Sequence, residues 1–181
     1  MTVRRWLAAF GAVAGTVLVG GGTAWAHVEV VPASAPRGGS EIISFSVPNE
    51  KDDANTVQLE IDLPTKSPIP SVSVQPKPGW TITTEKTKLA KPVTTDDGQV
   101  TEAVSKITWV ATEGGLTPGQ FDLFTISAGP LPTKGSSVVF KALQTYSDGD
   151  VVRWIEPTVK GTPEPDFPAP TLTLTRASRG H

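Results

Sequence analysis

The chain has 181 residues and carries 16 basic against 18 acidic side chains, which gives a formal net charge of −2 at pH 7. This balance argues against a nucleic-acid-binding protein, which needs a basic face. Cysteine is absent, which excludes disulfides, zinc sites built on thiolates and a blue-copper site. The 17 prolines and 17 glycines separate short runs of β-branched and aromatic residues, a pattern typical of an all-β sandwich or barrel.

Residues 1–26 have the features of a cleaved signal peptide. Arg4 and Arg5 precede a mostly apolar run, and an A-x-A cleavage pattern closes at Ala26. The two arginines fit either a plain positive n-region, which is the commoner case, or twin-arginine export. Their removal leaves 14 basic side chains against 18 acidic ones. We expect the remaining residues, 27–181, to form a single domain outside the cytoplasmic membrane.

Cleavage after Ala26 makes His27 the first residue and gives it a free amine. The amine nitrogen and the imidazole Nδ1 of one residue can close a six-membered chelate ring around a metal ion. Both are nitrogen donors that suit divalent copper, nickel or zinc. The other histidine of the chain is His181, at the C-terminal end. The alternative is that His27 is first by chance, because some residue must be.

The mature chain has no sulfur ligand, since its sole methionine is Met1, which leaves with the signal peptide. Soft Cu(I) prefers thiolate and thioether donors, whereas Cu(II) accepts nitrogen and oxygen. If copper binds, we therefore expect Cu(II). Imidazoles and terminal amines take up protons near pH 6.5 and about pH 7.7 to 8.0, so the affinity is expected to fall as the pH drops below about 6.

Alternation of apolar and polar residues predicts a series of strands. The clearest is 56–63, in which Val57, Leu59, Ile61 and Leu63 share one face. Further strands are expected at 27–31, 43–47, 72–74, 80–88, 103–112, 121–128, 137–147, 151–156 and 171–176. No segment has a sustained period of 3.6 residues, so we expect helices to be minor.

Turn and loop signals separate these strands. Asp148-Gly149 between two apolar runs predicts a tight hairpin turn, and 116–120 predicts another turn. Their polar composition predicts exposed loops at 64–70 and 91–98. The proline-rich segment 157–170 is expected to be irregular and to lead back to the last strand.

The sequence contains no recognisable catalytic constellation. Neither histidine lies in a strand-loop context that would activate a serine or cysteine nucleophile. The carboxylate pairs Asp52-Asp53 and Asp96-Asp97 fall in polar segments, where solvated turn residues are expected. An oxidative copper enzyme that uses a terminal histidine brace generally requires a second histidine ligand. We therefore expect no enzymatic activity.

Six short stretches follow one another along the mature chain. They are His27-Val28-Glu29-Val30-Val31-Pro32, Val47-Pro48-Asn49-Glu50, Pro78-Gly79-Trp80, Pro118-Gly119-Gln120-Phe121, Gln144-Thr145-Tyr146-Ser147-Asp148-Gly149 and Val152-Arg153-Trp154. Their order and content resemble the YcnI-like family of exported copper-binding domains, over essentially the whole mature chain. The resemblance implies a β-sandwich of immunoglobulin or cupredoxin-like shape that binds one Cu(II) through the mature N-terminal histidine, in a monohistidine brace.

The same resemblance implies a set of metal-site residues. His27 matches the brace, Trp154 matches a tryptophan close to the metal, and Glu50 matches an acidic side chain at the site. Three other residues are alternatives for the carboxylate: Glu29, Glu41 and Asp148. Trp109, in contrast, is flanked by apolar residues and is expected to be buried packing.

These observations together predict an exported Cu(II)-binding protein that buffers copper or passes it to another carrier or an importer. No second apolar stretch reaches the length that spans a bilayer, so we expect no membrane span in the mature chain. The alternative is an extracytoplasmic β-sandwich that contacts another protein and whose His27 is incidental. A copper oxidase or monooxygenase ranks last, because a second histidine ligand is missing.

Overall fold

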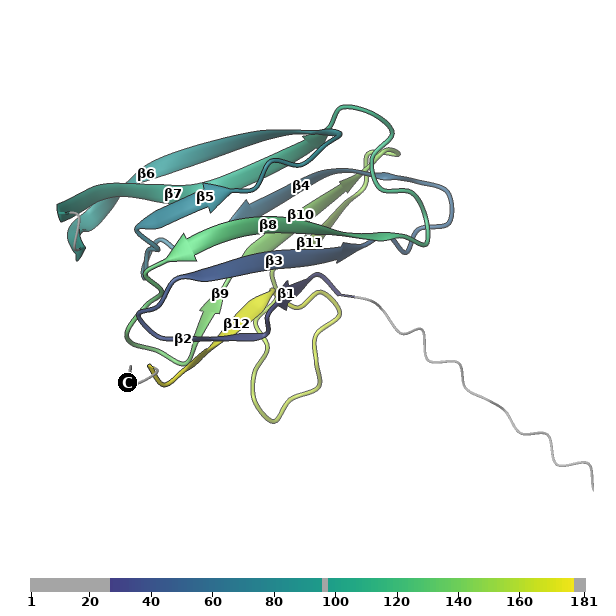
Figure 1. The fold of residues 1–181 in the computed structure, drawn as a ribbon. Coiled ribbons are helices and arrows are strands. Elements are labelled where there is room, and N and C mark those ends of the chain that lie inside the picture. The colour runs from purple at the N-terminus through teal and green to yellow at the C-terminus, as the bar shows by residue number, and fades with distance from the viewer. Residues whose placement is uncertain (1–26, 96–97, 178–181) are drawn as a thin grey trace, which may run out of the picture.

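The described part of the chain, residues 27–95 and 98–177 of a computed structural model, forms β-strands and no helix (Figure 1). A four-stranded sheet has the order β1 (Glu29–Val31), β3 (Glu41–Pro48), β8 (Phe121–Gly129), β5 (Ser71–Val74). A five-stranded sheet has the order β11 (Val151–Trp154), β10 (Lys141–Tyr146), β4 (Thr56–Asp62), β7 (Gly98–Ala111), β6 (Trp80–Thr95). A small third sheet has the order β2 (Ser34–Pro36), β12 (Thr171–Thr175), β9 (Ser137–Val139). The predicted all-β fold class is therefore confirmed.

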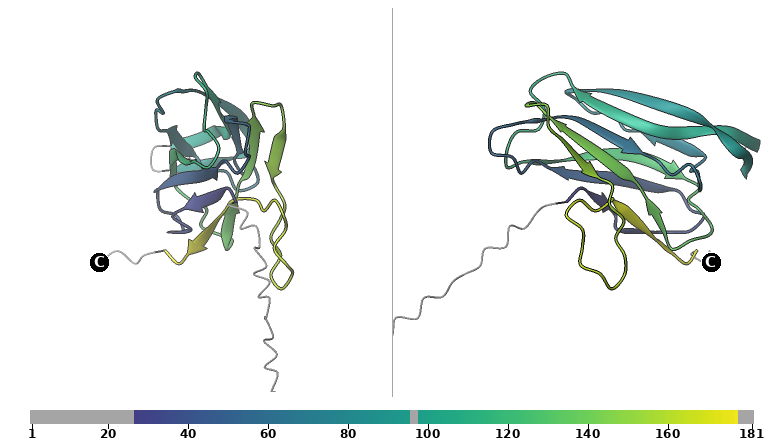
Figure 2. Two further views of the ribbon diagram at one scale, coloured as in Figure 1. Left: turned by 90° about the vertical axis from the view of Figure 1, so that its right-hand side faces the viewer. Right: turned by 180° about the vertical axis from the view of Figure 1, so that it is seen from behind.

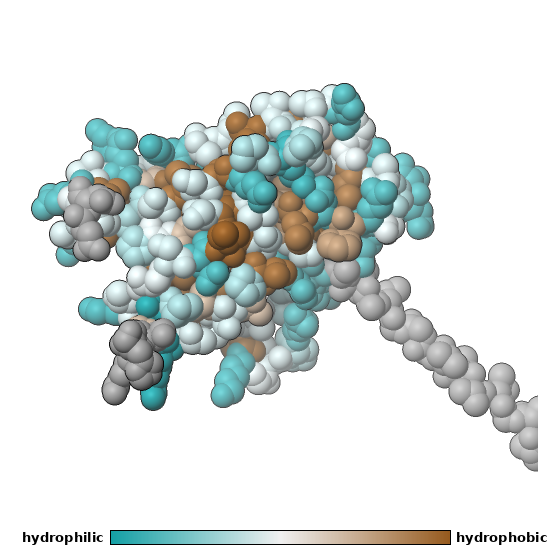
Figure 3. All heavy atoms as spheres, in the orientation of Figure 1, coloured by the Kyte–Doolittle hydropathy of each residue, from teal (hydrophilic) through white to brown (hydrophobic). Residues whose placement is uncertain are grey.

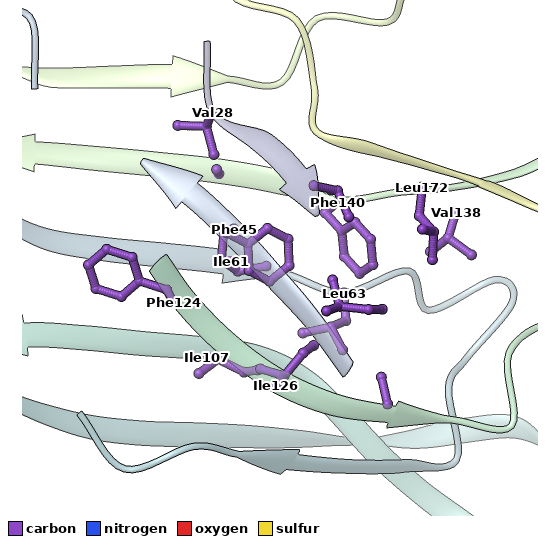
Figure 4. Packing of buried hydrophobic residues seen from close by; sticks show 14 of the residues in the cluster. Val28, Phe45, Ile61, Leu63, Ile107, Phe124, Ile126, Val138, Phe140 and Leu172 are labelled. Atoms are coloured by element: carbon purple, nitrogen blue, oxygen red, sulfur yellow. The ribbon is translucent and has the colours of Figure 1, made fainter. Parts of the chain in front are cut away.

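The hydrophobic core lies where alternate residues of the strands face inward (Figure 4). On β3, Ile43, Phe45 and Val47 are fully buried, while the residues between them are half-buried. Phe45 meets Phe140 edge-on, with ring centroids 5.1 Å apart and an interplanar angle of 83°. Removing each such side chain from water stabilises the fold by about 1.5–3 kcal/mol.

The strand predicted at 56–63 is present, but at its first two residues the side chain that faces inward is not the one expected. Leu59 is buried as expected, whereas Val57 is half-buried and Thr56 is fully buried. A β-bulge explains the difference, because Thr145 pairs with Gln58 while the next residue of β10 pairs with Thr56. Val57 is thus the extra residue that shifts the alternation by one position.

Two other expectations are wrong in detail. The strand predicted at 137–147 is two strands, because the chain leaves the small sheet at the buried Phe140 and enters the five-stranded sheet. From the segment 91–98, expected to be a loop, residues 91–95 and Gly98 belong to the β6–β7 hairpin, in which Thr95 pairs with Gly98; residues 96 and 97 lie outside the described residues. Figures 1 and 2 show this hairpin extending beyond the rest of the sandwich. Pairing with a neighbouring strand outweighs the polar composition there.

The other turn and loop predictions are confirmed. Gly149 has a φ of 93°, and the hairpin between β10 and β11 closes through the Tyr146 amide, which donates to the Asp150 carbonyl at 2.9 Å. Glycine adopts this left-handed conformation without the steric penalty of a side chain. The segments 64–70 and 157–170 lie outside the strands, as expected.

The outer face of the four-stranded sheet carries several apolar side chains. Ile42 is 65% exposed, Phe121 68% and Leu123 43%. Small polar residues stand beside them, because Ser46 pairs with Leu123 and Ser127 pairs with Ile42. Figure 3 shows apolar groups interspersed with polar ones on the surface that faces the viewer.

Candidate metal centre

His27 lies directly before β1, the edge strand of the four-stranded sheet. Val28 and Val30 anchor this end of the chain, since they are 2% and 5% exposed and point into the core. Pairing of Glu29 with Ser46 of β3 fixes the register. The His27 side chain is thereby held at the end of the sandwich and is 21% exposed.

Trp154 is the last residue of β11 and supplies the surface against which His27 packs. The two ring centroids are 5.7 Å apart, with an interplanar angle of 58°. Trp154 is 4% exposed and also contacts Phe167 edge-on at 5.6 Å. The structure therefore brings together two residues that the sequence analysis chose from opposite ends of the mature chain.

Glu50 is exposed and lies in the loop that follows β3. It lines a pocket of about 290 Å³ together with the Trp154 ring, and Tyr146 and Phe167 add further aromatic surface to the same pocket. The loop is fixed by the preceding residue, Asn49, which is 2% exposed. Glu50 therefore shares a pocket with Trp154, and His27 contacts the Trp154 ring.

The alternative carboxylates differ in their positions. Glu41 begins β3 and pairs with Ala128, so it lies at the other end of the strand from Pro48 and away from His27. Asp148 accepts a hydrogen bond from the Lys51 ammonium group. Glu29, in contrast, lines the same groove as His27.

Glu164 is a neighbour of His27 that the sequence analysis missed. Its Oε1 lies 3.6 Å from the His27 Nδ1, and its side chain is 64% exposed. It comes from the irregular segment between β11 and β12, which Figure 1 shows beside β1. No local motif marks Glu164. The signal that could have pointed to it is the presence of an acidic residue in the segment that follows Trp154.

His27 and Glu164 together line a groove of about 600 Å³. Its walls come from β1, from the small sheet and from the segment between β11 and β12. Lys160 also contributes to the lining. The His27 imidazole thus borders an open groove and also contacts the Trp154 ring.

Charged side chains beside the aromatic pocket form a compact ion-pair cluster. The Lys51 Nζ donates to Asp148 Oδ2 and to Asp150 Oδ2, and it lies 4.9 Å from the centre of the Tyr146 ring. These hydrogen bonds raise the pKa of Lys51 above its ordinary value and lower the pKa of Asp148. Burial raises the pKa of the Tyr146 hydroxyl. The cluster keeps the charge of Lys51 compensated next to Glu50.

Across residues 27–95 and 98–177, no three side chains of histidine, cysteine, aspartate or glutamate gather as a metal-ligand cluster. The same residues contain no helix long and apolar enough to cross a membrane.

Comparison with known proteins identifies the family. A family model described as a domain of unknown function, DUF1775, matches residues 27–174. This chain belongs to the DUF1775 family. A curated relative of this DUF1775 chain is the copper-binding protein CutI of Bacillus subtilis (strain 168), with 32% identity over 168 residues. That match covers 93% of this chain and 72% of CutI, and it confirms the resemblance to the YcnI-like family.

A solved structure supports the same assignment for this DUF1775 chain. The crystal structure of an uncharacterized protein from Nocardia farcinica, described as having an immunoglobulin-like fold, has 37% sequence identity and a TM-score of 0.65. It covers 84% of this chain and 99% of the other. The predicted immunoglobulin-like β-sandwich is therefore confirmed.

Proposed function

We propose that this protein binds a single Cu(II) ion outside the cytoplasmic membrane and buffers it or passes it to another copper carrier or an importer. The observation that carries the proposal is the placement of His27 against the buried Trp154 ring, which also lines the pocket that contains Glu50. Imidazole nitrogen and carboxylate oxygen are donors that suit a divalent cation.

The proposed donor set combines main-chain and side-chain atoms. Signal-peptide cleavage after Ala26 would free the His27 amine, which would chelate Cu(II) together with the imidazole Nδ1. Glu50 would supply a carboxylate oxygen, and Trp154 would shield the site from water. Nitrogen and oxygen donors without sulfur suit Cu(II) better than Cu(I).

The comparisons support this proposal in two ways. The match to the family model begins at residue 27, which is the residue that cleavage would make first. The relative CutI is called a copper-binding protein, and it matches most of this chain. The comparisons therefore support the copper-binding part of the proposal most directly. The histidine brace, the export and the transfer of copper are more specific proposals.

The proposal also treats copper as cargo and not as a catalytic centre. A single histidine ligand leaves the site short of the three nitrogen donors that oxidative copper enzymes with a terminal brace generally use. Incubation of the copper-loaded protein with ascorbate should therefore produce no more peroxide than the same protein without copper. Excess peroxide from the wild-type protein would favour a copper oxidase.

The decisive experiment compares two forms of the mature chain. Both are made by ligating a synthetic N-terminal peptide to the rest of the chain; one begins with a free His27 amine, and the other carries an acetyl group on that amine, which keeps the imidazole, converts the amine to an amide and adds no second amine. The ligated chain without the acetyl group is the matched control for the unmodified mature chain. Cu(II) affinity is measured by competition with a chelator, and the ligand atoms are examined by paramagnetic resonance.

Blocking the amine should lower the Cu(II) affinity by more than the roughly 10- to 100-fold that loss of an outer-shell partner costs. The ligated chain with the free amine should bind like the unmodified mature chain. Equal affinity of the two N-terminal forms would exclude the brace. Mass spectrometry of the exported protein tests separately whether His27 is the first residue.

A second candidate function is supported by the exposed Ile42, Phe121 and Leu123 on the outer sheet face. Exposed apolar groups can mark a surface that contacts another protein. A protein-interaction module without a specific metal would bind Cu(II) only weakly and without defined stoichiometry. A stoichiometric titration therefore separates this candidate from the first.

A further inference from the structure

Buried polar side chains are concentrated at one end of the sandwich. Among residues 27–95 and 98–177, the polar or charged residues that are buried are Asn49, Thr56 and Gln144, at 2%, 0% and 0% exposure. Asn49 directly precedes Glu50, and Gln144 is bonded to Trp154. All three therefore lie immediately behind the residues of the candidate metal centre.

Gln144 uses both ends of its amide group. Its Oε1 accepts a hydrogen bond from the Trp154 Nε1 at 3.1 Å. Its Nε2 donates to the Pro48 carbonyl at 2.8 Å and to Thr56 Oγ1 at 2.7 Å. A flipped amide would place a donor against the indole N–H, so only this orientation satisfies all three contacts.

The Pro48 carbonyl connects Gln144 to the segment that carries Glu50. Next along the chain, the Asn49 Nδ2 donates to the Ala54 carbonyl at 2.8 Å and to the Leu116 carbonyl at 2.9 Å. The Asn49 Oδ1 accepts from the Lys51 amide at 3.0 Å. Hydrogen bonds of the buried Asn49 side chain therefore hold the main chain on both sides of Glu50.

The β-bulge on β4 is part of the same arrangement. Because Val57 is the extra residue, the bulge turns the Thr56 side chain inward, where its Oγ1 meets the Gln144 amide. A buried amide is costly unless its hydrogen bonds are made, and an apolar side chain of similar size would avoid that cost. Polar groups in such a place fix geometry more than they add stability.

We propose that Gln144 is a positioning residue of the metal centre. Its buried amide holds the Trp154 indole and the Pro48 carbonyl in one rigid frame, so that the wall behind His27 and the segment carrying Glu50 keep a fixed relation. This inference rests on the proposed function for its copper readout. Its structural part is measured on the metal-free protein.

Two variants and one matched control test the proposal. Gln144→Met keeps the volume and removes both ends of the amide. Thr56→Val removes one partner of that amide. Thr125→Val is the control, because the Thr125 hydroxyl makes a half-buried hydrogen bond, 2.8 Å from Ser44 Oγ, on the other sheet.

The first readout is the exchange rate of the indole N–H protons by NMR in the metal-free mature chain. That chain has three tryptophans, since two of the five, Trp6 and Trp25, leave with the signal peptide. Trp154→Phe assigns the signal. The Trp154 N–H should exchange roughly 2- to 10-fold faster in Gln144→Met, as loss of one hydrogen bond predicts, while Thr125→Val stays at the wild-type rate.

The second readout is copper binding. Gln144→Met should lower the Cu(II) affinity roughly tenfold, at the low end of the range for outer-shell partners, and should change the paramagnetic resonance spectrum. Thr56→Val should do the same to a smaller extent. A merely structural role would lower thermal stability in all three variants and leave the spectrum unchanged.

The proposal is overturned if folded Gln144→Met binds Cu(II) within about twofold of the wild type with the same spectrum. If Gln144→Met does not fold, Thr56→Val is used in its place. Its Cu(II) affinity and its spectrum are then compared with those of Thr125→Val by the same criteria. Should the wild-type chain itself bind no Cu(II) stoichiometrically, the proposed function fails. The exchange rates still decide whether Gln144 fixes the indole ring.

Discussion

Two buried tryptophans of this protein are held in different ways. Trp109 of β7 is fully buried, and its Nε1 has no hydrogen-bond partner in the described structure. It packs edge-on against Phe124, with ring centroids 5.5 Å apart. Trp154 is nearly as buried, but its Nε1 donates to Gln144. The core therefore holds an indole ring by packing alone, whereas the candidate metal centre fixes its indole ring by a hydrogen bond.

The difference shows which property each region supplies. A buried N–H without a partner costs about 1–3 kcal/mol, and the core tolerates that cost because the large ring buries much apolar surface. At the candidate metal centre, the same group is satisfied, and the ring's orientation is set together with that of the Pro48 carbonyl. Packing around Trp109 stabilises the core, whereas the hydrogen bond to Trp154 fixes the position of its ring at the candidate metal centre.

Truncation of Trp109 should have the largest effect on stability. Trp109→Ala should lower the free energy of unfolding by about 3–5 kcal/mol, measured by urea denaturation, because it leaves a cavity in the core. The folded fraction should keep its Cu(II) affinity, since Trp109 does not line the site. A parallel loss of affinity would show that the two regions are not independent.

A pair of milder substitutions separates packing from bonding. Trp154→Phe leaves the Gln144 Oε1 without its donor, whereas Trp109→Phe removes an N–H that has no partner. Both lose similar volume, so Trp154→Phe should be more destabilising than Trp109→Phe by about 1–3 kcal/mol in urea unfolding. Equal losses would mean that the Gln144 bond adds nothing to stability.

The carboxylates at the metal centre can be ranked by isosteric substitution. Glu50→Gln should lower the Cu(II) affinity by more than the roughly tenfold expected for an outer-shell partner, because it removes the proposed charged ligand. Glu164→Gln should change it by less than about threefold, because exposed ion pairs contribute little. The measurement is chelator competition on both variants. The opposite ranking would assign the ligand role to Glu164.

The ion-pair cluster beside the centre should have the smallest effect. The Lys51 hydrogen bond lowers the pKa of Asp148 below 3.8, so this pair stabilises the fold above that pH and loses its effect as the pH falls through the lowered value. Asp148→Asn should therefore be slightly less stable than the wild type at pH 6, and the gap should shrink at pH 3. A gap that stays constant in urea unfolding at both values would contradict this assignment.

Local pattern was sufficient for most strands and for the turn at Gly149. Ile43, Phe45 and Val47 alternate with polar residues, and such a pattern has only one way to bury its apolar face in a sheet. Pattern failed where pairing between distant segments decides. The β6–β7 hairpin continues through the polar stretch 91–95 because Val93, Thr94 and Thr95 pair with Val100, Gln99 and Gly98 of β7.

The candidate site, like the fold, was predictable from the sequence only in part. His27 followed from the cleavage pattern, and Trp154 and Glu50 followed from the resemblance to a family. Glu164 was missed because it lies in an irregular segment whose path no periodicity describes. Gln144 was part of a matching stretch, yet its contacts with Trp154 and Pro48 join three separate strands or loops.

The sequence by itself determined the strand pattern, the residue that cleavage would expose and the absence of sulfur ligands, because each is a property of neighbouring residues or of composition. Only the tertiary structure decided that Thr56 and not Val57 faces inward, that Glu164 lies beside His27, and that one buried amide joins Trp154 to Pro48. These contacts depend on register and loop path. Both are set by the packing of the whole sandwich, which no local pattern encodes.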